Sequence, residues 1–173
     1  MMDNEYNIRV VKLEDAERLA EIYSYYVEET AVSFEYQAPS KNDFQDRIRK
    51  TVEKYPYIVC TYNDRVVGYA YAEAYSTREA YNWTVTSSIY IDKAFRRKRI
   101  GSALYVELEK KLKKMGIVNI LAGVAYSENE DEYLSHDSMK FHLKEGYTQV
   151  AHMPSIGKKF GRWYDLLWLQ KKI

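Results

Sequence analysis

The chain has a single cysteine, almost no net charge and no long hydrophobic run, and each shortage excludes a class of protein. Cys60 alone cannot form an internal disulfide, which fits a reducing compartment. With 26 Lys and Arg against 25 Asp and Glu, no global field draws the chain to nucleic acid or to a membrane surface. No apolar run approaches the ~20 residues of a membrane span. We therefore expect a soluble, cytoplasmic protein without nucleic-acid or membrane partners.

Repeats, low-complexity tracts and linkers are also lacking, so residues 1–173 are expected to form one domain. Hydrophobic residues make up 46% of the chain and aromatic residues 15%, which argues against disorder. The 18 tyrosines are expected to lie half-buried along sheets or clefts. Cys60 falls in the apolar segment 57–62 and is interpreted as a small core residue rather than a nucleophile.

Hydrophobic periodicity predicts strands and helices along the whole chain. The expected strands cover residues 6–12, 57–62, 65–74, 83–92, 117–124, 147–153 and 164–170. The expected helices cover residues 15–29, 40–55, 101–115 and 138–145. Ser40 and Asp43 resemble a capping box, and Asn63-Asp64 is typical of a hairpin turn. One mixed α/β sheet accounts for all of these elements.

The most informative segment is a basic turn between a predicted strand and a predicted helix. Four consecutive cations, residues 96–99, precede Gly101 and the first helical turn. Cations are poorly placed there, because the unpaired N–H groups at a helix N-terminus are already positive. Their presence predicts an anion held by backbone N–H groups and cationic side chains together. The turn therefore predicts a cradle for the phosphate groups of a ligand.

The order of the elements, with this turn before the third helix, resembles the GNAT superfamily of acyl-CoA N-acyltransferases. The superfamily signature Arg/Gln-x-x-Gly-x-Gly/Ala reads here Arg96-Arg97-Lys98-Arg99-Ile100-Gly101. The phosphinothricin acetyltransferase branch is more similar still, over six ordered motifs: Val32-Ser33-Phe34-Glu35, Val67-Gly68-Tyr69-Ala70-Tyr71-Ala72, Ala80-Tyr81-Asn82-Trp83-Thr84-Val85, Ser88-Ile89-Tyr90-Ile91, Phe141-His142-Leu143-Lys144-Glu145-Gly146-Tyr147 and Lys159-Phe160-Gly161-Arg162-Trp163-Tyr164-Asp165. The resemblance implies a GNAT fold of the α/β (α+β) class. Its central sheet would have about seven strands, splayed between the fourth and fifth, and about four flanking helices.

The resemblance also implies an activity. An acetyl group would pass directly from acetyl-CoA to the primary amine of a small molecule, without a metal. The expected acceptor is an amino acid or an amino-acid-like toxin of the phosphinothricin or methionine sulfoximine type. Transfer to a protein amine or a polyamine, and a non-catalytic acyl-CoA-binding module, are the alternative functions. The branch further implies a homodimer.

The implied cofactor site follows the fourth strand and the basic turn. The pantetheine arm is expected to make backbone contacts at Ile89, Tyr90 and Ile91, and an N–H near Tyr90 is expected to stabilise the oxyanion. The diphosphate is expected at the amides of Arg97, Lys98, Arg99, Ile100, Gly101 and Ser102. The family's Asn-x-x-Ser motif reads Ser135-His136-Asp137-Ser138, so Ser135 and Asn129 both remain candidates for a pantetheine contact. The acidic insertion 128–133 is expected to be a solvated loop, not a metal site.

Two positions depart from the family pattern. Arg99 stands at the first glycine of the signature, where it fits if its φ is negative. Thr86 stands where the branch usually has a glutamate that assists deprotonation of the amine. A threonine hydroxyl is no general base near neutral pH, so Thr86 is expected to orient water or substrate. Deprotonation then falls to Glu35, to Glu73 or to a water chain.

His142 is the further catalytic candidate, at a position that in many relatives holds a tyrosine near the sulfur. An ordinary histidine pKa of about 6.5 suits proton donation, whereas a buried, hydrogen-bonded histidine is the alternative. The acceptor site is expected where six side chains converge: Phe34, Glu35, Glu73, Trp83, Thr84 and Thr86. Phe34 and Trp83 are equally compatible with core packing, and Glu35 with a solvated surface. Lys158, Lys159 and Arg162 are candidates for binding a substrate carboxylate, with surface solvation as the alternative.

Overall fold

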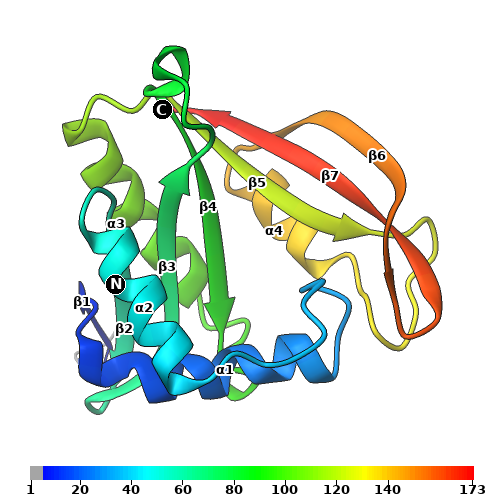
Figure 1. The fold of residues 1–173 in the computed structure, drawn as a ribbon, viewed down its shortest axis with the longest axis horizontal. Helices are drawn as coiled ribbons and strands as arrows, with labels where there is room; N and C mark the ends of the chain where they lie inside the picture. Colours follow the sequence, from blue (N-terminus) through cyan, green and yellow to red (C-terminus); the bar gives the residue numbers. More distant parts are fainter. Residues whose placement is uncertain (1–5) are drawn as a thin grey trace.

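The computed structural model describes residues 6–173 as a seven-stranded sheet with helices on both faces (Figure 1). The strands are β1 (Tyr6–Val10), β2 (Tyr57–Tyr62), β3 (Arg65–Ala74), β4 (Thr84–Ile91), β5 (Asn119–Tyr126), β6 (Thr148–Lys159) and β7 (Arg162–Lys172), in the order β1-β2-β3-β4-β5-β7-β6. The helices are α1 (Ala16–Glu28), α2 (Lys41–Val52), α3 (Ile100–Lys114) and α4 (Asp137–Lys144). The predicted mixed sheet with four helices is confirmed.

Two hydrophobic cores lie on opposite faces of the sheet, because side chains alternate along each strand. On β2, Ile58 and Cys60 pack against α3, whereas Tyr57 and Val59 pack against α1 and α2. Cys60 is fully buried, as expected of a core residue, and burial raises the pKa of its thiol to about 11. A thiol with such a pKa is not a nucleophile at neutral pH.

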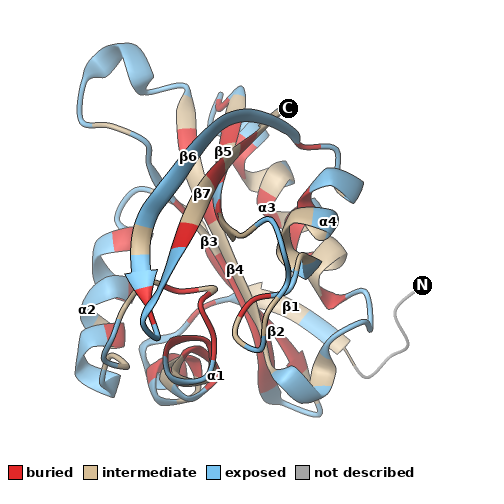
Figure 2. Ribbon diagram, turned by 90° about the vertical axis from the view of Figure 1, so that its right-hand side faces the viewer, coloured by how far each residue is buried: buried red, intermediate tan, exposed pale blue. Residues whose placement is uncertain are grey.

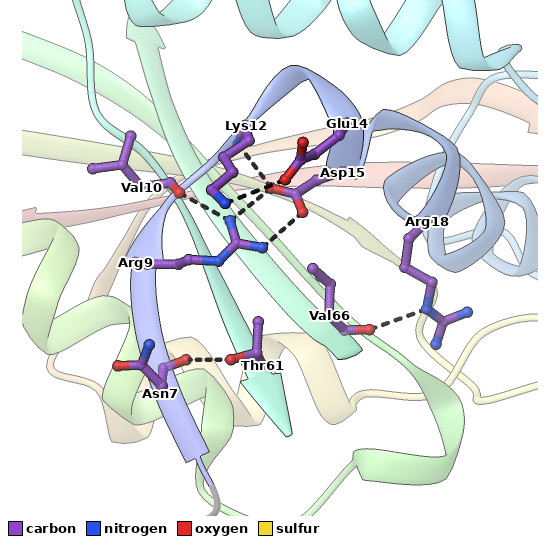
Figure 3. Close-up of polar contacts among 9 residues, drawn as sticks. All are labelled: Asn7, Arg9, Val10, Lys12, Glu14, Asp15, Arg18, Thr61 and Val66. Carbon is purple, nitrogen blue, oxygen red and sulfur yellow. Dashed lines mark hydrogen bonds and ion pairs between the residues drawn. The ribbon is translucent and has the colours of Figure 1, made fainter. Parts of the chain in front are cut away.

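The start of α1 is tied to the sheet by a group of polar contacts (Figure 3). The Arg9 guanidinium binds the Asp15 carboxylate at 2.8 and 2.7 Å, and the Lys12 amide donates to the same carboxylate at 2.7 Å. Burial opposes the ionised form, but these hydrogen bonds still lower the pKa of Asp15. Arg18 of α1 donates to the Val66 carbonyl of β3 at 3.0 Å. These contacts fix the position of α1, from whose far end the 30–39 loop departs.

β4 and β5 are the parallel neighbours in the sheet, and they pair only over residues 84–86 and 119–121. Beyond Thr86 the two strands diverge (Figure 1), and a cleft of about 50 Å³ opens between them. The predicted splay between the fourth and fifth strands is therefore confirmed. We call this space the splay cleft.

The C-terminal hairpin is longer than predicted. β6 and β7 extend to the turn at Phe160 and Gly161, which have φ of 51° and 73°. Nearly all of β6 is exposed (Figure 2). Its sequence therefore lacks the alternation of apolar and polar residues that predicts a half-buried strand, and its full length was not predicted. Asp3, Asn4 and Glu5, the polar residues near the start of the sequence, lie outside the described residues. Within residues 6–173, no helix has the length and apolar character needed to cross a membrane.

Candidate functional site

The splay cleft is lined from both faces of the sheet. The loop after α1 contributes Val32, and α4 contributes Ser138 and His142. The remaining walls come from the two strands and one loop residue: Ser87, Ser88, Ile89, Tyr90, Ala122, Gly123, Val124, Ala125 and Leu134. A molecule in this cleft is thus accessible to groups on both sides of the sheet.

The β4 edge that faces the cleft offers one unpaired amide. The Ile91 amide and carbonyl both bond to the Tyr26 hydroxyl, at 3.2 and 2.5 Å, so they point away from β3. Backbone direction alternates along an antiparallel strand, so Ile89 also points to the cleft, while Tyr90 belongs to the β3 ladder. Two of the three expected strand contacts therefore need correction: Ile91 is already bonded, and the Tyr90 amide faces β3. Of the amides near Tyr90, the one that faces the cleft without a partner on β3 is that of Ile89.

The basic turn leads directly into α3, and its four cations are exposed. Arg97 and Arg99 have φ of 61° and 62°, so the condition under which an arginine fits at position 99 without strain, a negative φ, is not met. Left-handed residues in a turn aim successive backbone N–H groups into a concave nest that suits an anion. The first-turn amides of α3 have no helical acceptors and can bind the same anion. The turn therefore fits the diphosphate expected there.

Gly101 and Ser102 also join α3 to α4. A Cβ at Gly101 would lie 3.0 Å from the Phe141 ring, so this glycine permits the close approach of the two helices. The Ser102 hydroxyl donates to the Glu145 carboxylate at 2.5 Å. A bulky residue at Gly101 would displace α4 and its cleft residues, besides any effect on phosphate binding.

His142 is 4% exposed and lies at the α4 wall of the splay cleft. Its Nδ1 donates to the Ser138 carbonyl at 2.7 Å, which leaves Nε2 to accept from the Tyr105 hydroxyl at 2.8 Å. Burial lowers the pKa of His142 below its usual value. A neutral imidazole with both nitrogens bonded has no spare proton, so this geometry favours the buried, hydrogen-bonded interpretation over proton donation. Tyr105 continues the network to the Ser87 hydroxyl at 3.4 Å.

Three of the six expected acceptor residues lie together on the sheet. Glu73 of β3 pairs directly with Thr86 of β4 in the ladder. Thr84 lies two residues earlier on the same side of β4, and its hydroxyl accepts from the Asn119 amide group at 3.3 Å. These three residues lie near the point where β4 and β5 stop pairing, at Thr86, which we call the apex of the splay.

The other three expected acceptor residues lie elsewhere. Trp83 is 58% exposed, so it is neither a core residue nor a wall of the splay cleft. The Phe34 ring packs 6.5 Å from the Tyr164 ring beneath the β6–β7 hairpin. Glu35 forms an ion pair with Arg47 at 2.9 Å and is only partly exposed. The loop therefore contributes packing and a fixed ion pair at these positions.

A second, smaller cavity of about 20 Å³ lies between the sheet and α2, and we call it the tyrosine cavity. Tyr90 lines both this cavity and the splay cleft. Its other walls are Tyr23, Phe44, Arg47, Thr51, Tyr57, Tyr69, Tyr71 and Glu73. Of the residues that line the tyrosine cavity, Glu73 and Tyr90 alone were predicted from the sequence as site residues. The overlooked signal is the alternation of Tyr69, Tyr71 and Glu73 on one face of β3.

Lys159 is buried at the end of β6, and its ammonium group is fully occupied. It donates to the carbonyls of Val27 at 2.6 Å, Thr30 at 2.8 Å and Ser33 at 2.7 Å. Burial lowers the pKa of this lysine. Neither of the interpretations proposed for Lys159, carboxylate binding or surface solvation, is correct: it clamps the C-terminal end of α1 and the loop after it.

The remaining candidates also have partners or lie outside the cleft. Arg162 pairs with Asp131 at 3.0 Å and with Glu132 at 2.8 Å, so it is not free for a substrate carboxylate. Asn129 and Ser135 are exposed and are not among the cleft walls, whereas Ser138 is. Among residues 6–173, no group of three or more His, Cys, Asp or Glu side chains is placed to hold a metal.

A sheet splayed between two parallel strands, with an anion nest at the helix that follows the first of them, defines the class of the protein. A family model for the acetyltransferase (GNAT) domain matches residues 8–168. The chain therefore belongs to the GNAT family of acetyltransferases.

The chain is also similar to individual acetyltransferases and to solved structures of this family. The chain is similar to phosphinothricin N-acetyltransferase of Streptomyces viridochromogenes, with 27% identity over 164 residues, 95% of this chain and 86% of that protein. It is also similar to the L-amino acid N-acyltransferase MnaT of Escherichia coli, with 30% identity covering 96% of this chain and 94% of that protein. The structure of yncA from Salmonella typhimurium with acetyl-CoA has a TM-score of 0.88 and 28% identity, covering 98% of this chain and 94% of that chain. The acetyl-CoA complex of a phosphinothricin acetyltransferase from Sinorhizobium meliloti has a TM-score of 0.88 and 29% identity, covering 98% and 89%.

Proposed function

We propose that the protein transfers an acetyl group from acetyl-CoA to the primary amine of an amino acid or an amino-acid-like compound of the phosphinothricin or methionine sulfoximine type. The observation that carries the proposal is the splay cleft, which is lined by α4 on one face and by the loop after α1 on the other. Similar proteins include phosphinothricin and methionine sulfoximine acetyltransferases. The homodimer and the cytoplasmic location stay predictions.

The donor side of the proposed site consists of backbone groups and cations. Bound acetyl-CoA would supply a thioester whose carbonyl carbon reacts with the amine. The Ile89 amide faces the cleft and is the proposed donor to the thioester oxygen as charge develops on it. The nest from Arg97 to Ser102 would hold the diphosphate, aided by charge-assisted hydrogen bonds from the cations.

On the α4 side, we assign His142 a positioning role. Its bond to the Tyr105 hydroxyl joins α4 to α3, whereas its bond to the Ser138 carbonyl lies within α4 and fixes the orientation of the ring. Together with the close contact between Gly101 and Phe141, the Tyr105 bond positions α4 as a wall of the cleft. The leaving thiolate would then take its proton from water at the open end of the cleft.

The test is thiol release from acetyl-CoA with a panel of amines: phosphinothricin, methionine sulfoximine, the common amino acids, spermidine and a short peptide. We expect turnover with at least one amino acid or analogue, with the product mass increased by one acetyl group. Turnover with spermidine or the peptide alone would replace the acceptor class. Measurable coenzyme A binding without turnover on any amine would replace the enzyme by a binding module.

A further inference from the structure

Acetyl transfer to an amine requires a base, and the residue at the apex of the splay cannot supply it. An alkylammonium with a pKa near that of lysine, about 10.4, is unprotonated in only about one molecule in 2,500 at pH 7. Thr86, the last β4 residue paired with β5, carries a hydroxyl that does not act as a base at that pH. A carboxylate within reach of the same point would serve.

Glu73 meets the positional requirement. It is directly opposite Thr86 in the antiparallel β3–β4 ladder. Directly opposite residues share a face of the sheet, with Cβ atoms about 4.5–5.5 Å apart. That face is the one covered by α1 and α2, because Glu73 lines the tyrosine cavity together with α2 residues. The Glu73 side chain therefore lies beside the apex, across the sheet from His142 and α4.

The surroundings of Glu73 are suited to a proton acceptor. The tyrosine cavity shares Tyr90 with the splay cleft as a lining residue, and the cavity volume of about 20 Å³ suffices for one water. The Tyr69 hydroxyl, which lines the cavity, is buried without a hydrogen-bond partner among the described residues. Such a hydroxyl indicates a polar ligand atom in the cavity, either water or a substrate group. Arg47 is the cationic side chain on the cavity wall. Tyr57 and Tyr71 are titratable side chains of the sheet that line the cavity and interact electrostatically with Glu73.

The competing carboxylate is Glu35. It forms two contacts with Arg47, at 2.9 and 3.2 Å, and lines an outer groove rather than the tyrosine cavity. The Glu35 carboxylate is therefore already committed to an ion pair on the outer groove. Glu73 has no ion pair with any of residues 6–173. Of the two, Glu73 is the carboxylate that is both adjacent to the apex and uncommitted.

We propose that Glu73 accepts the proton from the acceptor ammonium group, directly or through one water. Glu73 on β3 would thus take the role that a carboxylate at position 86 on β4 would have. This inference rests on the proposed function. The N–H bond breaks, its proton goes to a Glu73 oxygen and later to solvent, and the freed lone pair forms the C–N bond. The C–S bond breaks with its electrons on sulfur. A second N–H proton then leaves the nitrogen and balances protonation of the thiolate.

The experiment compares wild type, Glu73→Gln and the control Glu53→Gln, which changes an exposed glutamate at the C-terminal end of α2. We expect Glu73→Gln to lower kcat by about 100-fold or more at pH 7, the usual scale of general base loss. Its affinity for coenzyme A should be unchanged. The deficit should shrink steadily between pH 7 and 10, because more of the amine is already unprotonated. Glu53→Gln should match wild type throughout.

A rescue makes the role specific. In the Glu73→Gln background, Thr86→Glu places a carboxylate on the neighbouring strand and should recover at least tenfold in kcat. Unchanged kcat in Glu73→Gln would overturn the inference, as would a higher acceptor KM with normal kcat or a deficit that does not vary with pH. A wild type that is inactive on every amine refutes the proposed function itself, which separates the two failures. Coenzyme A titration of each variant verifies that it is folded.

Discussion

At the residue scale, Arg99 combines a strained backbone with a useful charge. It occupies the left-handed region at the N-cap of α3, and its side chain makes no capping hydrogen bond. Left-handed geometry costs a residue with a Cβ roughly 1–2 kcal/mol. The strain persists in a turn whose amides form the proposed anion nest, which is where functional strain is usually found.

Arg99→Gly should therefore stabilise the free protein while weakening coenzyme A binding. After allowing for the greater freedom of glycine in the unfolded chain, we expect a gain of about 0.5–1 kcal/mol in the free energy of unfolding. Urea denaturation measures the stability, and calorimetric titration measures the binding. Lys98→Gly is the matched control, since Lys98 is not in the left-handed region. It also removes one cation but should lose stability, and equal effects of both variants on stability would contradict the strain argument.

His142 predicts a pH dependence of stability. Its pKa is lowered in the folded protein, so the unfolded chain binds the proton more readily than the folded one. The free energy of unfolding should thus be constant above about pH 6.5 and fall as the pH drops toward the folded pKa, by up to about 1.4 kcal/mol per unit of separation. Denaturation of wild type and His142→Gln between pH 5 and 8 checks this. The variant should lack this part of the slope, and an identical slope in both proteins would show that His142 does not titrate abnormally.

At the element scale, the β6–β7 hairpin is attached to the loop after α1 by Lys159. Its three bonds to the carbonyls of residues 27, 30 and 33 satisfy the end of α1 and fix the loop whose Val32 lines the splay cleft. A charged donor on buried carbonyls contributes about 1.5–3 kcal/mol per bond. Through Lys159, the hairpin thus holds the loop after α1, which lines the cleft on the side of the proposed acceptor.

Lys159→Met should cost at least about 3 kcal/mol of stability, because it leaves three carbonyls without a donor. If the fold survives, the KM for the acceptor should rise more than the KM for acetyl-CoA, since the basic turn is untouched. Lys158→Met is the control: Lys158 is exposed, and its ammonium lies over the Trp163 ring. That variant should stay within about 0.5 kcal/mol of wild type. Equal losses in both variants would contradict the clamp.

Sequence reasoning predicted the elements well where local periodicity determines them. The strands 57–62 and 65–74 with their Asn63-Asp64 turn match β2 and β3, because both faces are buried and the turn residues adopt positive φ. Features that depend on the pairing between strands were not predicted. Alternate β4 amides face β3 and the cleft, and the sequence does not show which set faces the cleft. The position of Glu73 opposite Thr86 likewise depends on the register between β3 and β4. The fate of Lys159 depends on a contact with residues more than 120 positions away.

At the scale of the whole molecule, the sheet consists of two halves joined along one short seam. β1 to β4 form one half and β5 to β7 the other, and the pairing between them covers three residues on each side. Beyond the seam, the core against α3 includes residues of both halves, such as Val85 and Leu167, and holds them together. A ligand in the splay cleft would add a second link between the halves and stabilise the folded state, by about 2.7 kcal/mol at a concentration of 100 times its Kd.

This arrangement predicts an alternating pattern of amide hydrogen exchange along β4. In the free protein, the Ile89 amide should exchange much faster than those of Ser88 and Tyr90, which point into the β3 ladder. The Ile91 amide should be protected by its bond to the Tyr26 hydroxyl. Saturation with coenzyme A should slow exchange at Ile89 at least tenfold and leave the relative order of the others unchanged, because an added strand pairs only with groups that face it. Nuclear magnetic resonance detects each amide separately, and Tyr26→Phe is the control that should expose Ile91 alone. Protection of Tyr90 without protection of Ile89 would mean that the ligand does not lie along this edge, and the acetyl-donor side of the proposed site would have to be placed elsewhere.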